Sequence, residues 1–170
     1  MICMPRVRSI FSFGILSLSM SFALSGFAFA AQNFPEGPRA EMTPGSLCQK
    51  NSGYRYPEHI KYCNRSVDSG MKNEIIKEYD QTFGYSVRSM PRRAFKIDHL
   101  IPLCAGGSNN QDNLWPQHES VYAITDPLEP LVCEKMADGK LSQADAVQLI
   151  HEAKNDLSKV AAIISHLESL

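Results

Sequence analysis

The stretch from residue 95 to residue 118 holds the residue types of this chain that are best suited to chemistry. Asp98 and His99 are adjacent in residues 95–101, a segment that predicts a strand ended by Pro102. Neighbouring strand residues point to opposite sides. A carboxylate can hold a hard cation, and a histidine at the end of a strand can hold or accept a proton near neutral pH. Taken alone, however, an Asp-His pair more often only stabilises a loop.

A turn and a second short strand follow this pair. Gly106-Gly107-Ser108-Asn109 is a turn cluster, and Leu114-Trp115 predicts a strand. Asn113 can bond backbone groups across the loop and fix its shape. His118 follows closely enough to return to the same site. Trp115 is the only tryptophan, and we expect it in the core, with contact to a nucleobase as the alternative.

These segments together resemble the signature of the HNH nucleases of the ββα-metal superfamily, in particular small bacterial exported or phage-borne HNH proteins. The motifs that carry the resemblance are Asp98–Leu103, Gly106–Asn109 and Asn113–Gln117. The close likeness covers about residues 95–118, and a looser one covers about residues 47–155. The resemblance implies an α+β fold, in which a mostly helical, disulfide-stapled domain surrounds a hairpin-helix core.

The resemblance also implies roles for three residues. His99 corresponds to the general base that activates water, and Asp98 to a ligand of the single divalent cation. We expect Mg²⁺, with Mn²⁺ or Ca²⁺ as alternatives. Asn113 lies fourteen residues after His99 and matches the central Asn of the family. That residue usually braces the loop that holds the base, although in some relatives an Asn of this region binds metal.

The third family position departs from the pattern. Many relatives carry His or Asn about nine residues beyond the central Asn, and here that position is Tyr122, a poor metal ligand. Asp126 comes later, beside Pro127. We therefore expect His118 to be the second metal ligand, with a grip on the scissile phosphate as its alternative role.

Local positive charge precedes the proposed site. Seventeen Lys and Arg face eighteen Asp and Glu in the whole chain, which argues against a generally basic, DNA-coating protein. The predicted phosphate contacts come from a loop just upstream of the pair, and an ordinary solvated basic loop is the alternative. They are Arg88, Arg92, Arg93 and Lys96.

The N-terminus predicts export. Arg6 and Arg8 precede an uncharged apolar stretch, Ile10–Phe29, and Ala28-Phe29-Ala30 is a small-x-small cleavage site. Residues 1–30 are therefore expected to be a signal peptide, although the stretch is long enough for an uncleaved membrane anchor. Cleavage would leave a periplasmic or secreted chain without a membrane segment, with 15 Lys and Arg against 18 Asp and Glu.

Four cysteines remain after that cleavage, and an even count in an exported chain predicts two disulfides. Three pairings exist. We favour Cys48–Cys63, because these residues flank one short aromatic loop, which leaves Cys104–Cys133. A zinc site is the alternative, but the chain has no Cys-x-x-Cys pair.

The remaining sequence predicts helices around the hairpin. Residues 31–46 are rich in Pro and Gly and predict a flexible lead-in to a domain of residues 47–170. The predicted helices run from about 68 to 82, from near 118 to before Pro127, from Asp126 to near Gly139, and from Ser142 onward. The last carries a regular apolar stripe as far as Leu167. We expect most of this stripe in the core, and the alternative is that its far end docks a protein partner or a second copy.

Three functional hypotheses follow. The first is an exported endonuclease that cleaves DNA with little sequence specificity, and the second is a ribonuclease that uses the same site. The third is a catalytically degenerate binding module with an HNH fold, which the tyrosine at position 122 favours.

Overall fold

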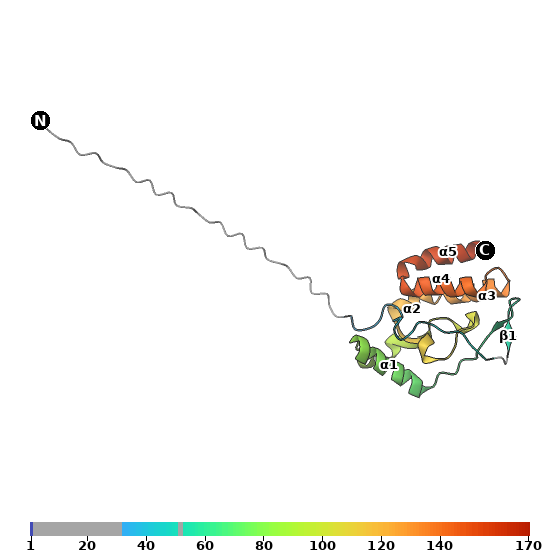
Figure 1. The fold of residues 1–170 in the computed structure, drawn as a ribbon, viewed down its shortest axis with the longest axis horizontal. Helices are drawn as coiled ribbons and strands as arrows, with labels where there is room; N and C mark the ends of the chain where they lie inside the picture. The colour runs from blue at the N-terminus through green and yellow to red at the C-terminus, as the bar shows by residue number, and fades with distance from the viewer. Residues whose placement is uncertain (2–31, 51–52) are drawn as a thin grey trace. The chain divides into compact units, whose positions relative to one another are not determined.

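The computed structural model describes Met1, residues 32–50 and residues 53–170 (Figure 1). The predicted signal peptide, apart from its first residue, lies outside these ranges. In the described part of the chain, no helix has both the length and the apolar character needed to cross a membrane.

The described domain is a mixed α/β structure with two small antiparallel sheets, one of strands β1 and β2 and the other of strands β3 and β4. The strands are β1 Tyr54–Arg55, β2 Ile60–Lys61, β3 Phe95–His99 and β4 Leu114–His118. The helices are α1 Ser69–Phe83, α2 Glu119–Thr125, α3 Leu128–Ala137, α4 Gln143–Asn155 and α5 Val160–Ser169.

Both strands of the β3–β4 hairpin contribute to the hydrophobic core. Its register places Phe95 opposite His118 and His99 opposite Leu114. In β3, Phe95, Ile97 and His99 are buried, whereas Lys96 and Asp98 alternate with them and are partly exposed. The strand therefore ends with an acid and a histidine on opposite faces, as the sequence predicts.

Helix α1 forms as its end signals predict. The side chain of Asp68 accepts a hydrogen bond from the N–H of Met71, and Gly84 ends the helix in the left-handed conformation. Ile75 and Tyr79 are buried on the inner face of the helix, which packs against β4.

The predicted flexible lead-in, residues 31–46, is wrong for the described residues 32–46, because this segment packs onto the domain. Thr43 is buried, and its hydroxyl donates to the carbonyl of Leu114 at 3.0 Å. The N–H of Gly45 donates to Asp112 O at 2.8 Å. A chain rich in Pro and Gly is ordered here because its polar groups find partners in the domain.

The predicted single long C-terminal helix is two helices, which lie along each other in Figure 1. Asp156 interrupts the helix with an extended backbone, φ −143° and ψ 95°, and its side chain accepts from the N–H of Ser158. The apolar stripe then folds back, so that Val160 and Leu167 are buried in α5, which packs against α3. Most of the apolar stripe is therefore packed inside the domain, whereas docking of a partner at its far end stays a prediction.

Both predicted disulfides are confirmed. Cys48 is bonded to Cys63, and Cys104 to Cys133. The second bond connects α3 to the loop that follows β3. The predicted core position of Trp115 is also confirmed, since its side chain is completely buried.

Candidate active site

Asp98 and His99 open into one cleft of about 350 Å³, although they lie on opposite faces of β3. This is possible because His99 is the last residue of the strand, where the chain turns away. The residues in the wall of the cleft that can carry charge are Arg65, Asp98, His99 and Glu129. The Cys104–Cys133 disulfide forms another part of the wall.

The imidazole of His99 is 3% exposed and has a polar partner at each ring nitrogen. Arg65 Nη1 lies 3.3 Å from Nδ1, and Asn109 Oδ1 lies 3.2 Å from Nε2. Burial lowers the pKa of His99 below its usual value, the hydrogen bond to Asn109 opposes this effect, and the charge of Arg65 adds to it. His99 is therefore a neutral imidazole at neutral pH.

Asn113 braces the loop between the two strands. Its Oδ1 accepts from the N–H of Ile101 at 2.9 Å, and its Nδ2 donates to the carbonyls of Ile101 and Ser108, each at 3.0 Å. Gly107 lies inside the same loop, where a Cβ would meet Ile101 O at 1.8 Å. Because both ends of the buried amide are bonded to the backbone, Asn113 fixes the shape of this loop.

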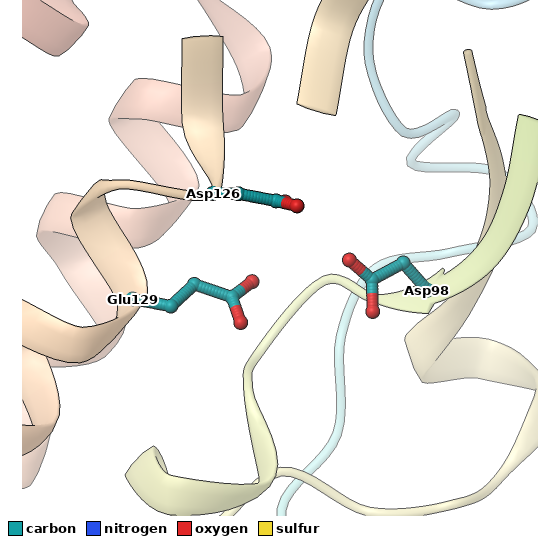
Figure 2. A group of neighbouring side chains, drawn as sticks. All are labelled: Asp98, Asp126 and Glu129. Carbon is teal, nitrogen blue, oxygen red and sulfur yellow. The ribbon is translucent and has the colours of Figure 1, made fainter. Parts of the chain in front are cut away.

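Three carboxylates converge on the Asp98 side of the cleft, as Figure 2 shows. Asp126 follows α2 and Glu129 lies in the first turn of α3. One oxygen from each of Asp98, Asp126 and Glu129 lies within 4.8 Å of the others. Oxygen ligands at this spacing are the type that hard divalent cations prefer.

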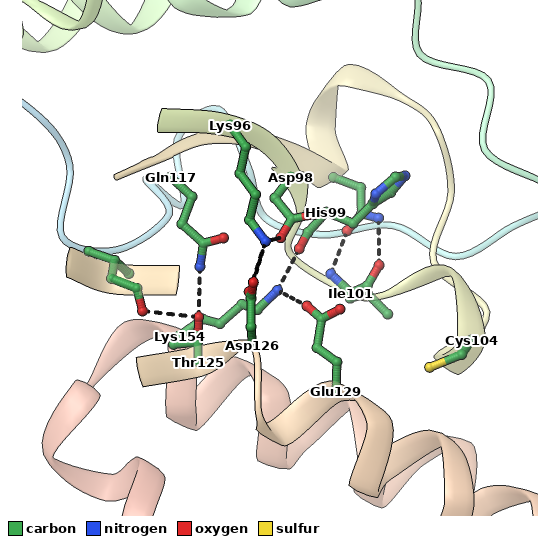
Figure 3. Close-up of polar contacts among 12 residues, drawn as sticks. Lys96, Asp98, His99, Ile101, Cys104, Gln117, Thr125, Asp126, Glu129 and Lys154 are labelled. Carbon is green, nitrogen blue, oxygen red and sulfur yellow. Dashed lines mark hydrogen bonds and ion pairs between the residues drawn. The ribbon is translucent and has the colours of Figure 1, made fainter. Parts of the chain in front are cut away.

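Two lysines already neutralise part of this charge (Figure 3). Lys96 Nζ lies 3.0 Å from Asp98 Oδ2 and 2.7 Å from Asp126 Oδ2. Lys154 is completely buried, and its Nζ donates to Glu129 Oε1 and to the main-chain oxygen of His99, each at 2.7 Å. Three carboxylates thus face two ammonium groups, which leaves one carboxylate in excess.

The ammonium groups keep Asp98 ionised. Burial alone would raise the pKa of the Asp98 carboxyl, but the charges of Lys154 and Lys96 outweigh it, so that this pKa is lowered. Asp98 Oδ2 is buried and makes no hydrogen bond to the described residues apart from the ion pair with Lys96. The donor set fits a hard cation if the ammonium group of Lys96 moves away.

His118 does not join this cluster, contrary to the prediction that it is the second metal ligand. It pairs with Phe95 at the far end of the hairpin, four residues from His99, which corresponds to about 13 Å along the strand. Its ring stacks on Phe34 with centroids 3.8 Å apart, and its Nδ1 lies 2.9 Å from Ser120 Oγ. The strand register is the physical reason, since it also places His118 on the face opposite to Asp98.

The predicted basic loop also lies away from the cleft. Arg88, Arg92 and Arg93 precede β3, at the end of the strand opposite to His99. Arg92 donates to Phe95 O at 2.9 Å. Lys96 is not a free phosphate contact, because its ammonium group is ion-paired and lies 4.8 Å from the centre of the Tyr122 ring.

The sequence predictions gave no role in the site to five of its residues, and one of these, Asp126, was set aside in favour of His118. Asn109 stands in the Gly-Gly-Ser-Asn turn and Arg65 two residues after Cys63, and both motifs could have drawn attention to them. Glu129 and Lys154 had no local signal, because helix packing alone brings them to the hairpin.

Comparison of the chain with protein-family models, with curated proteins and with solved structures finds no match.

Proposed function

We propose that this chain is a metal-dependent endonuclease of the HNH type, which hydrolyses phosphodiester bonds in nucleic acid, with DNA as the first-choice substrate. The observation that carries the proposal is that a neutral imidazole, His99, and an ionised carboxylate, Asp98, share one cleft. The order of β3, braced loop, β4 and α2 supports the hairpin-helix core that the sequence resemblance implies.

His99 is the proposed general base. Hydrolysis requires that a water molecule be positioned, deprotonated and directed at a phosphorus atom that is surrounded by negative oxygens. A neutral imidazole with a lone pair facing the cleft can accept this proton. Burial keeps the ring in that form at neutral pH, and the loop braced by Asn113 holds it at the end of β3.

Arg65 is the proposed anchor for the scissile phosphate. Its guanidinium lies beside Nδ1 of His99, and the residue is exposed to solvent. A guanidinium presents several N–H donors in a plane and binds phosphate oxygens in a bidentate manner. A phosphate held by Arg65 would therefore lie next to the nitrogen that accepts the proton of the attacking water.

The acidic side of the cleft would hold the cation. Asp98, Asp126 and Glu129 offer the oxygen ligands for Mg²⁺, with Mn²⁺ or Ca²⁺ as alternatives. When bound, such an ion supplies positive charge for the leaving oxygen of the phosphodiester. The chain itself would contribute by releasing Lys96 from the Asp98 and Asp126 carboxylates.

The basic residues before β3 would contact phosphates that flank the cleaved bond. Arg88, Arg92 and Arg93 are exposed, and they precede Phe95, the end of β3 that lies about 13 Å along the strand from the proposed base. Such contacts read no bases, so binding would be sequence-blind and would weaken as salt rises.

A second candidate is a nucleic-acid-binding module without catalysis, and the ion pairs of Lys96 and Lys154 favour it. Their ammonium groups occupy the side of the cleft where a cation would be needed. In that case Arg65 would still bind phosphate, but no divalent ion would be required.

The two disulfides are compatible with a periplasmic or extracellular protein. Export by cleavage of residues 1–30 is part of the proposal, and N-terminal sequencing of the protein recovered outside the cytosol would test it.

Incubation of the chain from residue 31 onward with plasmid DNA and with RNA, in Mg²⁺, Mn²⁺ or EDTA, separates these functions. Cleavage of plasmid that EDTA abolishes is the expected result, and preferential cleavage of RNA would favour the ribonuclease. Binding of both nucleic acids without cleavage in any metal would leave the binding module and reject the enzyme.

A further inference from the structure

The imidazole of His99 is held from both sides by partners that can satisfy only one arrangement of its proton. Arg65 faces Nδ1 at 3.3 Å, and because a guanidinium has donors only, Nδ1 must accept. Asn109 Oδ1 faces Nε2 at 3.2 Å. Both contacts thus require the tautomer in which Nε2 carries the hydrogen and Nδ1 carries the lone pair.

The backbone determines which way the Asn109 amide points. Asn109 Oδ1 accepts from the N–H of Ser66 at 3.1 Å, and Asn109 Nδ2 donates to the carbonyl of Asn64 at 2.8 Å. A flipped amide would place two donors against each other at Ser66 and two acceptors at Asn64. The amide oxygen is therefore held toward Nε2 by groups that cannot change their chemistry.

Asn109 also anchors the segment that carries Arg65. Its two backbone bonds go to the residues on either side of Arg65. The arginine donates in addition to Ile97 O at 3.0 Å from Nη2. One side chain thus positions both the proposed base and the proposed phosphate anchor.

We infer that Asn109 is a positioning residue, which keeps the proton of His99 on Nε2 and leaves the lone pair of Nδ1 available to the attacking water. The inference rests on the proposed function. When Arg65 turns from Nδ1 toward a phosphate, Nδ1 loses the N–H donor that favours this tautomer. The hydrogen bond between Nε2 and Asn109 then has to maintain the tautomer by itself. Asn109 still accepts from Nε2 in that state. It then acts like the third group that orients the histidine beside a nucleophile in other enzymes.

The direct test is the ¹⁵N spectrum of the histidine rings in the chain from residue 31 onward, with the signals of His99 assigned by their loss in His99→Gln. Nitrogen shifts separate the two tautomers. In the wild-type protein and in Arg65→Ala, we expect the Nε2–H form. In the double variant Arg65→Ala, Asn109→Ala, we expect the shifts of the two ring nitrogens to converge, as in a tautomer mixture.

Asn109→Asp loses the donor to Asn64 O but keeps a side-chain acceptor that can face Nε2. It should therefore keep the Nε2–H form, which tests the inference even if the alanine variants do not fold. Asn110→Ala is the matched control, because Asn110 is exposed and its side chain caps no helix. The inference is overturned if the double alanine variant retains the wild-type shifts, or if Asn109→Asp loses the Nε2–H form.

Cleavage kinetics supply an independent readout. Loss of the outer partner of a metal-ligating histidine typically costs 10- to 100-fold. We expect a loss of similar size for the proposed base, so Asn109→Ala should lower kcat by about that factor while KM changes little. Asn110→Ala should leave kcat unchanged. Absence of cleavage by the wild-type protein would reject the proposed function, whereas the ring spectra test the role of Asn109 without any turnover.

Discussion

The buried ammonium group of Lys154 donates at 2.7 Å to the main-chain carbonyl of His99. The same Nζ is ion-paired with Glu129 at 2.7 Å. A lysine from α4 therefore ties the end of β3 to α3, immediately behind the residue that we propose as the general base.

Lys154→Met should destabilise the domain strongly. The variant leaves the partly exposed Glu129 without its ion-pair partner and the carbonyl of His99 without its donor. Removal of one member of a fully buried pair costs about 3–5 kcal/mol, which is the upper bound here. Urea unfolding would measure the change. Lys159→Met is the matched control, since Lys159 forms an exposed pair with Glu152 at 3.5 Å, and it should change the free energy of unfolding far less than Lys154→Met does. Equal losses in both variants would contradict the role given to Lys154.

His99→Ala should abolish most of the cleavage, whereas His118→Ala should not. A positioned general base contributes about 10²–10⁴-fold, so His99→Ala should lose a factor of that size. His118 stacks on Phe34 at the far end of the hairpin, so His118→Ala should retain nearly full activity. Plasmid nicking with a thermal melt of each variant would measure this. A metal-binding defect in His118→Ala would instead support His118 as the second metal ligand, a role that the strand register argues against.

The rate should remain high below the usual pKa of histidine. Because burial lowers the pKa of His99 from 6.5, the ring stays neutral, and competent as a base, to a lower pH than a free histidine. The acidic limb of kcat/KM should therefore lie below pH 6.5, and a limb above that value would contradict the assignment.

The same shift predicts how stability depends on pH. In the unfolded chain His99 takes up its proton near 6.5, whereas in the folded protein it does so only at a lower pH. Stability from this group is thus complete above pH 6.5 and is lost as the pH falls to the folded pKa. His151 is shifted in the same direction. The decrease in the free energy of unfolding at acidic pH should therefore be smaller in His99→Gln, and smaller again when His151→Gln is added.

Lys96→Met should increase the affinity for divalent cations. The Lys96 ammonium is ion-paired with Asp98 and Asp126, and its removal leaves two carboxylates without the competing positive charge. An increase of about tenfold in Mg²⁺ or Mn²⁺ affinity, which corresponds to about 1.4 kcal/mol, is expected by calorimetry. Lys77→Met removes an exposed ion pair with Glu74 on α1 and should change nothing. Unchanged affinity in Lys96→Met would show that the metal binds elsewhere or not at all.

Arg65→Ala should impair turnover more than the loss of the distant arginines. We expect a loss of at least about tenfold in kcat/KM, because a charged hydrogen bond to phosphate contributes about 1.5–3 kcal/mol. The double variant Arg92→Ala, Arg93→Ala should instead reduce the slope of binding against salt concentration, with a smaller effect on kcat. A larger loss of turnover in the double variant than in Arg65→Ala would show that the scissile phosphate is bound by the loop before β3 and not by Arg65.

Local chemistry in the sequence was enough to predict several parts of the molecule. Asp68 and Gly84 define the ends of α1 through bonds that each makes within one turn. The pairing Cys48–Cys63 follows from a short loop. Asp98 and His99 are adjacent, so that any strand ending at this point presents both of them at the same place.

Tertiary structure alone decided the surroundings of that pair. Whether His118 approaches Asp98 depends on the register of β4 against β3, and the spacing along the chain does not specify this register. Glu129 and Lys154 reach the hairpin because α3 and α4 pack on it and on each other. The bend at Asp156 likewise turns one apolar stripe into two packed helices. Periodicity and end signals act over a few residues, whereas the ligands and counter-charges of this cleft come from segments that are distant in the sequence, and only burial of their apolar faces brings them together.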